Sequence, residues 1–155
     1  MRMSRDNVTP FRRPPRRPQQ RSSGGKPWTT PRGKAVLVQL VTLLAYALNF
    51  YFRAPPSSYI ALAVGVAGAA IAFSNRSAEA MPWAQTHHEH ALRTLIIGYA
   101  IWTVASLLPL VLATLDPVKW YIWLAVLVWV VIRAGVGLVL AIMRRPIWHP
   151  KGMLL

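Results

Sequence analysis

The stretch SNRSAEAMPWAQTHHEHALRT, at Ser74–Thr94, is the only long polar interruption between Ala35 and Met143. It contains three of the four histidines and two of the four acidic residues of the chain. The segments on both sides of it are apolar enough to lie in lipid. If those segments cross a membrane, this stretch joins two helical hairpins and fixes the side on which each end of the chain lies.

The composition of the whole chain predicts a membrane protein. Its 155 residues carry a formal net charge of +14, and 54% of them are hydrophobic. A soluble domain with this much apolar surface would need a larger core than a chain of this length can enclose, whereas lipid accepts the surface directly. Because the chain has no cysteine, disulfides, cysteine-based zinc sites and thiol chemistry are excluded.

Residues 1–34 form a predicted disordered, basic tail rich in proline and arginine, in which ten Lys and Arg residues face one acid, Asp6. The first apolar run begins only at Ala35, so the tail is not a secretory signal. An organellar transit peptide is a minor alternative, because the prolines block an amphipathic helix. The tail would set topology, contact anionic lipid headgroups, dock to a partner or touch nucleic acid or the ribosome. The candidate lipid- or partner-binding residues are Arg12, Arg13, Arg16 and Arg17.

Four apolar segments predict four transmembrane helices, at residues 35–52, 58–73, 93–115 and 120–143. Prolines predict tight turns at Arg53–Pro56 and at Asp116–Lys119. The second segment is rich in small residues at four-residue spacing, a pattern that permits close helix packing. Its candidate packing residues are Gly65, Gly68, Ala69 and Ala72.

The distribution of charge predicts the orientation of these segments. Four spans place the basic tail, the central polar stretch and a short tail at 146–155 on one side, and that side collects nearly all Lys and Arg. The other side receives only Arg53 and Lys119. The expected fold is therefore an all-α integral membrane protein with a four-helix domain at 35–145, arranged as two hairpins with both termini in the cytoplasm.

Arg133 is the unusual residue of the fourth segment. It lies 11 residues before Arg144, which places it about 16 Å into the bilayer along a helix. A charge at this depth costs about 2.5–3.5 kcal/mol and faces protein or water. No acidic residue of the chain is placed to pair with it, and we expect it to lie too far away to touch the Ser74–Thr94 stretch. It would lock the bundle through carbonyls and hydroxyls, line a substrate path, or hold an acidic partner or lipid phosphate.

The histidines are a second candidate site. On a helix His87 and His90 share a face, His88 and Glu89 point elsewhere, and His149 lies on the same side of the membrane. His87, His90 and His149 would form a zinc or proton-handling site. A lone His-x-x-His is a poor metal signature, so we expect a polar surface next to the membrane, with no metal and no other cofactor. The chain also lacks a phosphate loop, a catalytic triad pattern and paired carboxylates, which predicts that it is not an enzyme.

Two motifs resemble those of a known group. One is Thr86-His87-x5-Arg93-Thr94; the other is Trp129-x3-Arg133-x3-Gly137-Leu138, followed by Pro146-Ile147-x2-Pro150. Both are similar to signatures of small bacterial four-helix inner-membrane proteins, the Tic-twenty-like group, distant relatives of the membrane subunit of the chloroplast inner-envelope protein-import machinery. The resemblance covers roughly 35–150 and departs from the group at Leu95 and Ile96, where aromatics are usual. It implies cytoplasmic termini and a joint role for His87, Arg93, Thr94, Arg133 and Gly137.

These observations favour a non-enzymatic accessory or scaffold subunit of a larger complex in a bacterial inner membrane, with an organellar inner membrane as a minor alternative. Other membrane-protein subunits and anionic lipids are the expected partners. A protein-translocation or channel-like component, with Arg133 lining a polar path, is the alternative that the resemblance suggests. A metal- or pH-responsive membrane protein is the third. We further expect His87 and Arg133 to border one polar cavity that opens to the cytoplasm.

Overall fold

The computed structural model describes residues 26–52, 57–77, 81–150 and 152, and within them every regular element is helical. The four long helices are α1 (Pro31–Tyr51), α2 (Ser57–Asn75), α3 (Pro82–Val111) and α4 (Asp116–Ile142). Two short 3-10 helices, η1 (Pro27–Thr29) and η2 (Ala113–Leu115), precede α1 and α4. Four of these helices are long and apolar enough to cross a membrane. The predicted all-α fold with four candidate membrane-spanning helices is therefore confirmed.

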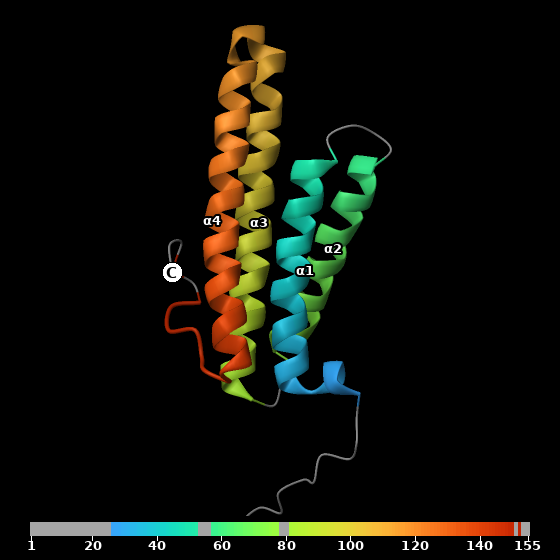
Figure 1. Cartoon of the computed structure of the whole chain (residues 1–155), viewed down its shortest axis with the longest axis vertical. Coiled ribbons are helices and arrows are strands. Elements are labelled where there is room, and N and C mark those ends of the chain that lie inside the picture. The colour runs from blue at the N-terminus through green and yellow to red at the C-terminus, as the bar shows by residue number, and fades with distance from the viewer. Residues whose placement is uncertain (1–25, 53–56, 78–80, 151, 153–155) are drawn as a thin grey trace, which may run out of the picture.

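The helices form a bundle in which α1 lies beside α2 and α3 lies beside α4 (Figure 1). Both α1 and α3 contact all three other helices, while α2 and α4 do not contact each other in the described part of the chain. The short diagonal of the bundle therefore runs between α1 and α3. The α3–α4 pair also extends beyond the ends of α1 and α2 (Figure 1).

The start of α1 corrects the predicted boundary of the basic tail at residue 34. The helix begins at Pro31, and the Thr30 hydroxyl caps it by accepting a hydrogen bond of 3.0 Å from the Gly33 amide. Threonine followed by proline is a common helix start. Proline fixes the first helical φ, and its missing amide N–H would have had no partner within the helix at this position. Lys34 then donates to Asn75 Oδ1 at 3.1 Å, which ties α1 to the end of α2. Arg12, Arg13, Arg16 and Arg17 lie outside the described residues.

The central polar stretch is mostly helical where the structure describes it, so the third helix starts well before the predicted membrane span at residue 93. The α3 helix begins at Pro82 and runs for 30 residues, so all three of its histidines lie within a helix rather than in a connecting loop. Hydropathy marks where a helix can enter lipid, whereas the helix itself starts at a proline in the first turn. The connection from α2 to α3 is correspondingly short.

The turn between α3 and α4 also differs from the predicted one at Asp116–Lys119. Leu112 and the 3-10 helix η2 make the turn, and Asp116 and Pro117 are the first residues of α4. Here proline starts a helix instead of stopping one, and an acidic residue in the first turn suits the positive end of the helix dipole. The other predicted turn, Arg53–Pro56, lies outside the described residues.

The small residues of α2 face its neighbours. Gly65 and Gly68 are buried, and a Cβ atom on Gly68 would lie 2.9 Å from a methyl carbon of Val41 on α1. A Cβ atom on Gly65 would overlap the Tyr99 ring on α3. Ala72 is buried and Ala69 is half-buried against the same core. The face of α2 that carries the predicted packing residues thus touches both α1 and α3.

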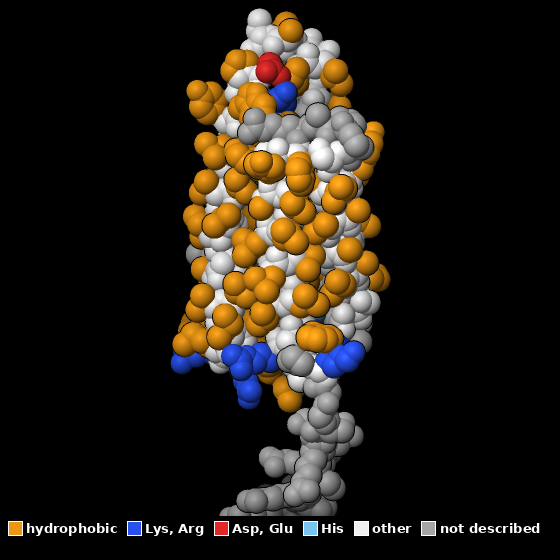
Figure 2. Space-filling view, turned by 45° about the vertical axis from the view of Figure 1, so that its right-hand side comes forward, with side chains coloured by type: hydrophobic (Ala, Val, Ile, Leu, Met, Phe, Trp, Pro, Cys, Tyr) orange, Lys and Arg blue, Asp and Glu red, His pale blue; other side chains and the backbone are white. Residues whose placement is uncertain are grey.

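The outer surface separates apolar and basic side chains. Hydrophobic side chains cover the length of the bundle, and Lys and Arg gather at one end of it (Figure 2). The described residues of this basic end include Arg32, Lys34, Arg144 and Arg145, whereas Lys119 at the opposite end pairs with Asp116. An apolar belt with one strongly basic rim is the surface that a membrane-spanning bundle requires.

Candidate functional site: a buried polar cluster near the basic end

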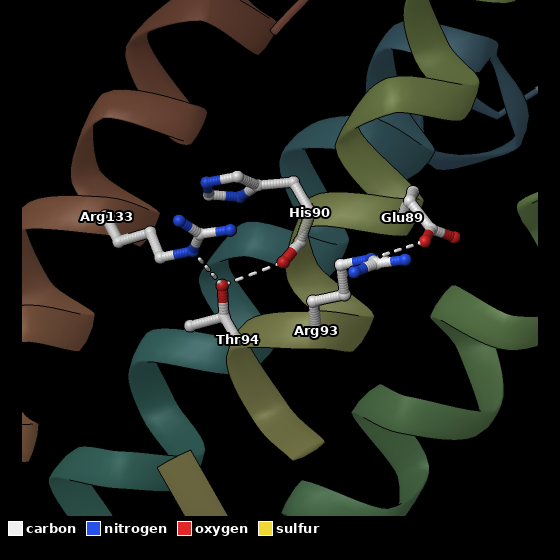
Figure 3. Close-up of polar contacts among 5 residues, drawn as sticks. All are labelled: Glu89, His90, Arg93, Thr94 and Arg133. Atoms are coloured by element: carbon white, nitrogen blue, oxygen red, sulfur yellow. Dashed lines mark hydrogen bonds and ion pairs between the residues drawn. The ribbon is translucent and has the colours of Figure 1, made fainter. Parts of the chain in front are cut away.

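Arg133 lies inside the bundle and contacts the Ser74–Thr94 stretch directly. Its side chain is fully buried, and its Nε donates a hydrogen bond of 2.9 Å to Thr94 Oγ1 (Figure 3). Thr94 in turn donates from the same hydroxyl to the His90 carbonyl at 2.7 Å. The prediction that Arg133 lies too far from this stretch is wrong, because α3 begins early and carries Thr94 to the depth of Arg133.

The rest of the Arg133 guanidinium has no polar partner among the described residues. Nη1 and Nη2 are both buried without a hydrogen bond. The Trp129 ring, one helical turn away on α4, lies 5.5 Å from the guanidinium carbon, a cation–π distance. Of the described acidic side chains, Glu89 pairs with Arg93 and Asp116 pairs with Lys119. Arg133 is therefore a buried cation held by one hydroxyl and one ring.

A line of polar side chains on α1 faces this cluster and continues it along the bundle axis. We call this line the polar seam: it comprises Gln39, Thr42, Tyr46 and Asn49. Tyr46 donates to the Leu95 carbonyl at 3.0 Å, and Asn49 donates to the Tyr99 hydroxyl at 2.6 Å. Gln39 donates to the His87 carbonyl at 3.3 Å, but its own Oε1 is buried with no hydrogen-bond partner among the described residues.

Two glycines give the polar seam its close approach to α3 and α4. A Cβ atom on Gly98 would overlap the Tyr46 hydroxyl, and a Cβ atom on Gly137 would lie 2.8 Å from the Gln39 amide carbon. Neither contact would form with a larger residue at the glycine position. The predicted site residue Gly137 therefore seats a polar side chain of α1, and Gly98 does the same on α3.

The three histidines of α3 are all buried, which corrects the prediction of a polar surface next to the membrane. The α3 helix contacts α1, α2 and α4, and the residues of its N-terminal half that these neighbours bury include all three histidines. His87 Nε2 lies 2.9 Å from the Arg145 carbonyl oxygen and donates to it, while Nδ1 is buried without a partner among the described residues. His90 also has a buried Nδ1 without a partner there, and its ring lies next to the Arg133 guanidinium (Figure 3).

Arg93 lies apart from this cluster. Its Nε donates to Glu89 Oε1 at 2.6 Å, one helical turn earlier on α3 (Figure 3), and both side chains are partly exposed. Such an exposed pair is worth only a few tenths of a kcal/mol, about 0.3–0.5 kcal/mol for this spacing. The structure therefore buries His87, Thr94, Arg133 and Gly137. Trp129 is half-buried beside Arg133, and Arg93 is partly exposed and pairs with Glu89 instead.

The residues after α4 fold back over the start of α3 as a strap, residues 143–150. The Ile147 amide donates to the Thr86 hydroxyl at 3.0 Å, the Ile147 side chain is buried, and the Arg145 carbonyl accepts from His87. Arg144 has a positive φ of 57°, which turns the chain at the helix end. The strap thus holds the entrance of α3 through two hydrogen bonds and one buried side chain.

A cavity of about 390 Å³ lies between this strap and α4. His90, Arg145 and His149 give it a polar and basic wall, Gly137 leaves room beside them, and Val136, Leu140, Ile147 and Trp148 are among its apolar residues. His87 and Arg133 are not in its lining, so this is not the expected single cavity bordered by both. Both side chains are buried in the bundle, and Arg133 lies beside the ring of His90 (Figure 3), which lines the cavity.

A metal centre finds no support in this arrangement. In the described ranges, no three His, Cys, Asp or Glu side chains gather closely enough to hold a metal ion. His149 lines the cavity with His90, whereas the ring of His87 is committed to the strap carbonyl. The histidine triplet that the sequence suggested is thus divided between two places.

The cluster is suited to holding negative charge, because the Arg133 guanidinium, the His87 and His90 rings and the Arg145 side chain lie near one end of the bundle. Gln39 and Gly98 were not predicted as site residues. A signal for Gln39 exists, since polar residues at 39, 42, 46 and 49 recur at helical spacing within an apolar segment. Nothing in the sequence distinguishes Gly98 from the other glycines of the membrane helices.

Comparison with known proteins adds no relative: no family model, no curated protein and no solved structure matches the chain. The resemblance to the Tic-twenty-like group therefore stays a prediction, and what it implies is carried forward only as a proposal.

Proposed function

We propose that the chain is a multi-pass protein of a bacterial inner membrane, with α1–α2 and α3–α4 as two hairpins and both termini in the cytoplasm. The basic rim supports this orientation, because it lies at the end of the bundle where α1 begins and α4 ends. Positively charged flanks are retained on the cytoplasmic side during insertion.

The absence of cysteine makes this orientation easy to test. In intact cells or sealed vesicles, a membrane-impermeant thiol reagent should label Lys119→Cys from outside. Ser77→Cys and Trp148→Cys should be labelled only after the membrane is opened. All three positions have exposed or partly exposed side chains, so labelling reports topology and not burial. Labelling of Trp148→Cys in sealed cells would contradict the proposed orientation.

Within this membrane, we propose a non-enzymatic role as an accessory or scaffold subunit of a larger complex. The observation that carries this proposal is the tip of the α3–α4 hairpin, which extends beyond α1 and α2 (Figure 1). At about 1.5 Å per residue, α3 with 30 residues is about 13 Å longer than α1 with 21. Leu110, Val111 and Tyr121 of this tip are 75–83% exposed.

An apolar tip longer than its neighbours creates a mismatch with a bilayer core of about 30 Å. Such a mismatch costs fractions of a kcal/mol per Å and can drive association with another membrane protein. The bundle interior supports a scaffold rather than a wide conduit, since Tyr46, Trp102 and Val130 are buried across its middle. A stable partner at the tip would explain why the longer hairpin exceeds the shorter one.

Photo-crosslinking in native membranes tests the subunit proposal. A crosslinking amino acid at Leu110 or Tyr121 should capture one discrete protein partner. The same amino acid at Leu44, an exposed apolar residue in the middle of α1, should give mainly lipid adducts. Equal capture at all three positions, or only free monomer at the tip, would count against a docked subunit.

A second candidate function is a translocation or channel-like component with Arg133 on a polar path. It is favoured by the two Arg133 nitrogens that have no partner among the described residues and by the polar seam. The known role of the plastid relatives adds only analogy, because the same fold can serve unrelated functions. Polypeptide crosslinking and transport that are unchanged by Arg133→Leu would remove this candidate.

A further inference from the structure

We propose that the cavity under the strap binds the phosphate group of an anionic membrane lipid. The proposal does not rest on the subunit role, because it concerns the opposite end of the bundle from the apolar tip. It also differs from attraction at the basic tail, since it names one site with a defined wall.

The charge balance of the interior calls for an anion at this place. Arg133 is fully buried, and its two terminal nitrogens have no hydrogen-bond partner among the described residues. Glu89 and Asp116 are committed to Arg93 and Lys119. A buried cation without a counter-charge is strongly disfavoured, so an anion from outside the described chain would stabilise it.

The cavity offers that anion an approach next to Arg133. His90 separates the two: it lines the cavity, and its ring lies beside the guanidinium (Figure 3). The residue is only 2% exposed, and its buried Nδ1 has no hydrogen-bond partner in the described chain. Arg145 and His149 add further nitrogen donors from the strap. A phosphate oxygen at this position would meet donors from α3 and from the strap together, the geometry that charge-assisted hydrogen bonds require.

The remaining wall identifies a lipid rather than free phosphate as the source. Val136 and Leu140 of α4 and Trp148 of the strap are apolar members of the lining. Val136 and Trp148 are also exposed on the outer surface, so the apolar wall continues onto the face that meets acyl chains. A volume of about 390 Å³ accommodates a phosphate with part of a glycerol backbone, while the acyl chains would lie outside along α4.

Native mass spectrometry of the full chain in a non-ionic detergent tests this site. The probes are dioleoylphosphatidylglycerol, dioleoylglycerol without a phosphate, and inorganic phosphate. Wild-type protein should retain one phosphatidylglycerol more tightly than the rest and should not retain dioleoylglycerol. The double variant Arg145→Gln/His149→Gln should weaken this single binding event by at least about tenfold, the effect of losing a charge-assisted hydrogen bond.

Arg144→Gln is the matched control, because Arg144 is an exposed basic neighbour that does not line this cavity. It should change the binding of phosphatidylglycerol less than about twofold, although it removes the same charge from the same rim. Arg144, Arg145 and His149 all have exposed side chains, so these variants should fold. The basic tail is present in every variant and cancels from the comparison.

Three results would overturn the proposal. The first is equal weakening by Arg144→Gln and by the double variant, which would mean diffuse attraction to the rim. The second is retention of dioleoylglycerol as tightly as phosphatidylglycerol, which would remove the phosphate from recognition. The third is binding of inorganic phosphate without retention of phosphatidylglycerol, which would mean a site for a free anion and not for a lipid.

Discussion

Gly98→Ala should strongly lower the stability of the bundle, because the added methyl group would overlap the Tyr46 side chain. The added carbon would lie 2.7 Å from Cζ of Tyr46, and even closer to its hydroxyl. Tyr46 cannot swing away freely, because it is fully buried and donates to the Leu95 carbonyl at 3.0 Å. Overpacking of this kind costs about 1–3 kcal/mol. The midpoint of thermal unfolding in detergent, followed by the monodisperse fraction on a sizing column, measures it.

Gly135→Ala is the control on the neighbouring helix, since no atom lies within 4 Å of a Cβ atom placed there. Its stability should stay the same or rise slightly, because alanine is the better helix former by about 0.5–1 kcal/mol. A second comparison combines Gly98→Ala with Tyr46→Leu. If the clash with Tyr46 is the cause, Gly98→Ala should cost much less in the Tyr46→Leu background than in the wild type. Equal costs in both backgrounds would contradict the assignment.

Thr94→Val should destabilise the protein by about 2 kcal/mol, although valine has nearly the same shape as threonine. The variant removes the hydroxyl that accepts from Arg133 Nε at 2.9 Å, and with it the one hydrogen bond that the described chain gives to the guanidinium. Thr103→Val is the matched control on α3, because Thr103 is exposed. It should change the free energy of unfolding by less than about 0.5 kcal/mol.

Variants of Thr94 and Arg133 together test whether the charge of Arg133 has a structural or a functional role. In Thr94→Val/Arg133→Met both partners are replaced by apolar groups, so the buried cation disappears together with its acceptor. The double variant should recover to within about 1 kcal/mol of the wild type, as replacements of buried ionic groups by apolar ones often do. If it is instead less stable than Thr94→Val alone, Arg133 contributes packing or binds an anion that stabilises the fold.

Much of the fold follows from apolar runs alone, because a segment long enough to cross a lipid core must be a helix there. The four spans are therefore visible in the sequence, and their positions agree with α1 to α4 within the membrane part. The helix ends are less visible. Pro82 and Pro117 both start helices, yet proline as a local signal is equally compatible with stopping one. The burial of the polar first half of α3 depends on the packing of this helix against three neighbours, which the sequence does not show.

The sequence predicted several residues of the site but not the contacts between them. Thr94, Arg133 and Gly137 were identified through a motif, and the structure places all three in the interior. Their contact depends on the register between α3 and α4, which the α3–α4 turn fixes at a distance from the site. Gln39 was not predicted as a site residue, because membrane helices often contain a single amide side chain without a function. Its significance comes from Gly137, whose missing side chain gives the amide its room.

The strap also has a consequence for the order in which the protein is completed. His87 hydrogen-bonds to the carbonyl of Arg145, which is synthesised 58 residues later. At about 5–20 residues per second, α3 waits roughly 3–12 s for the partner that closes its entrance. During that interval α3 must be inserted while the His87 imidazole, which is buried in the finished structure, is still exposed to water or to the insertion machinery. The entrance of α3 is therefore closed only after the strap has been synthesised, and a chain without the strap would reach the membrane with His87 unbonded to the Arg145 carbonyl.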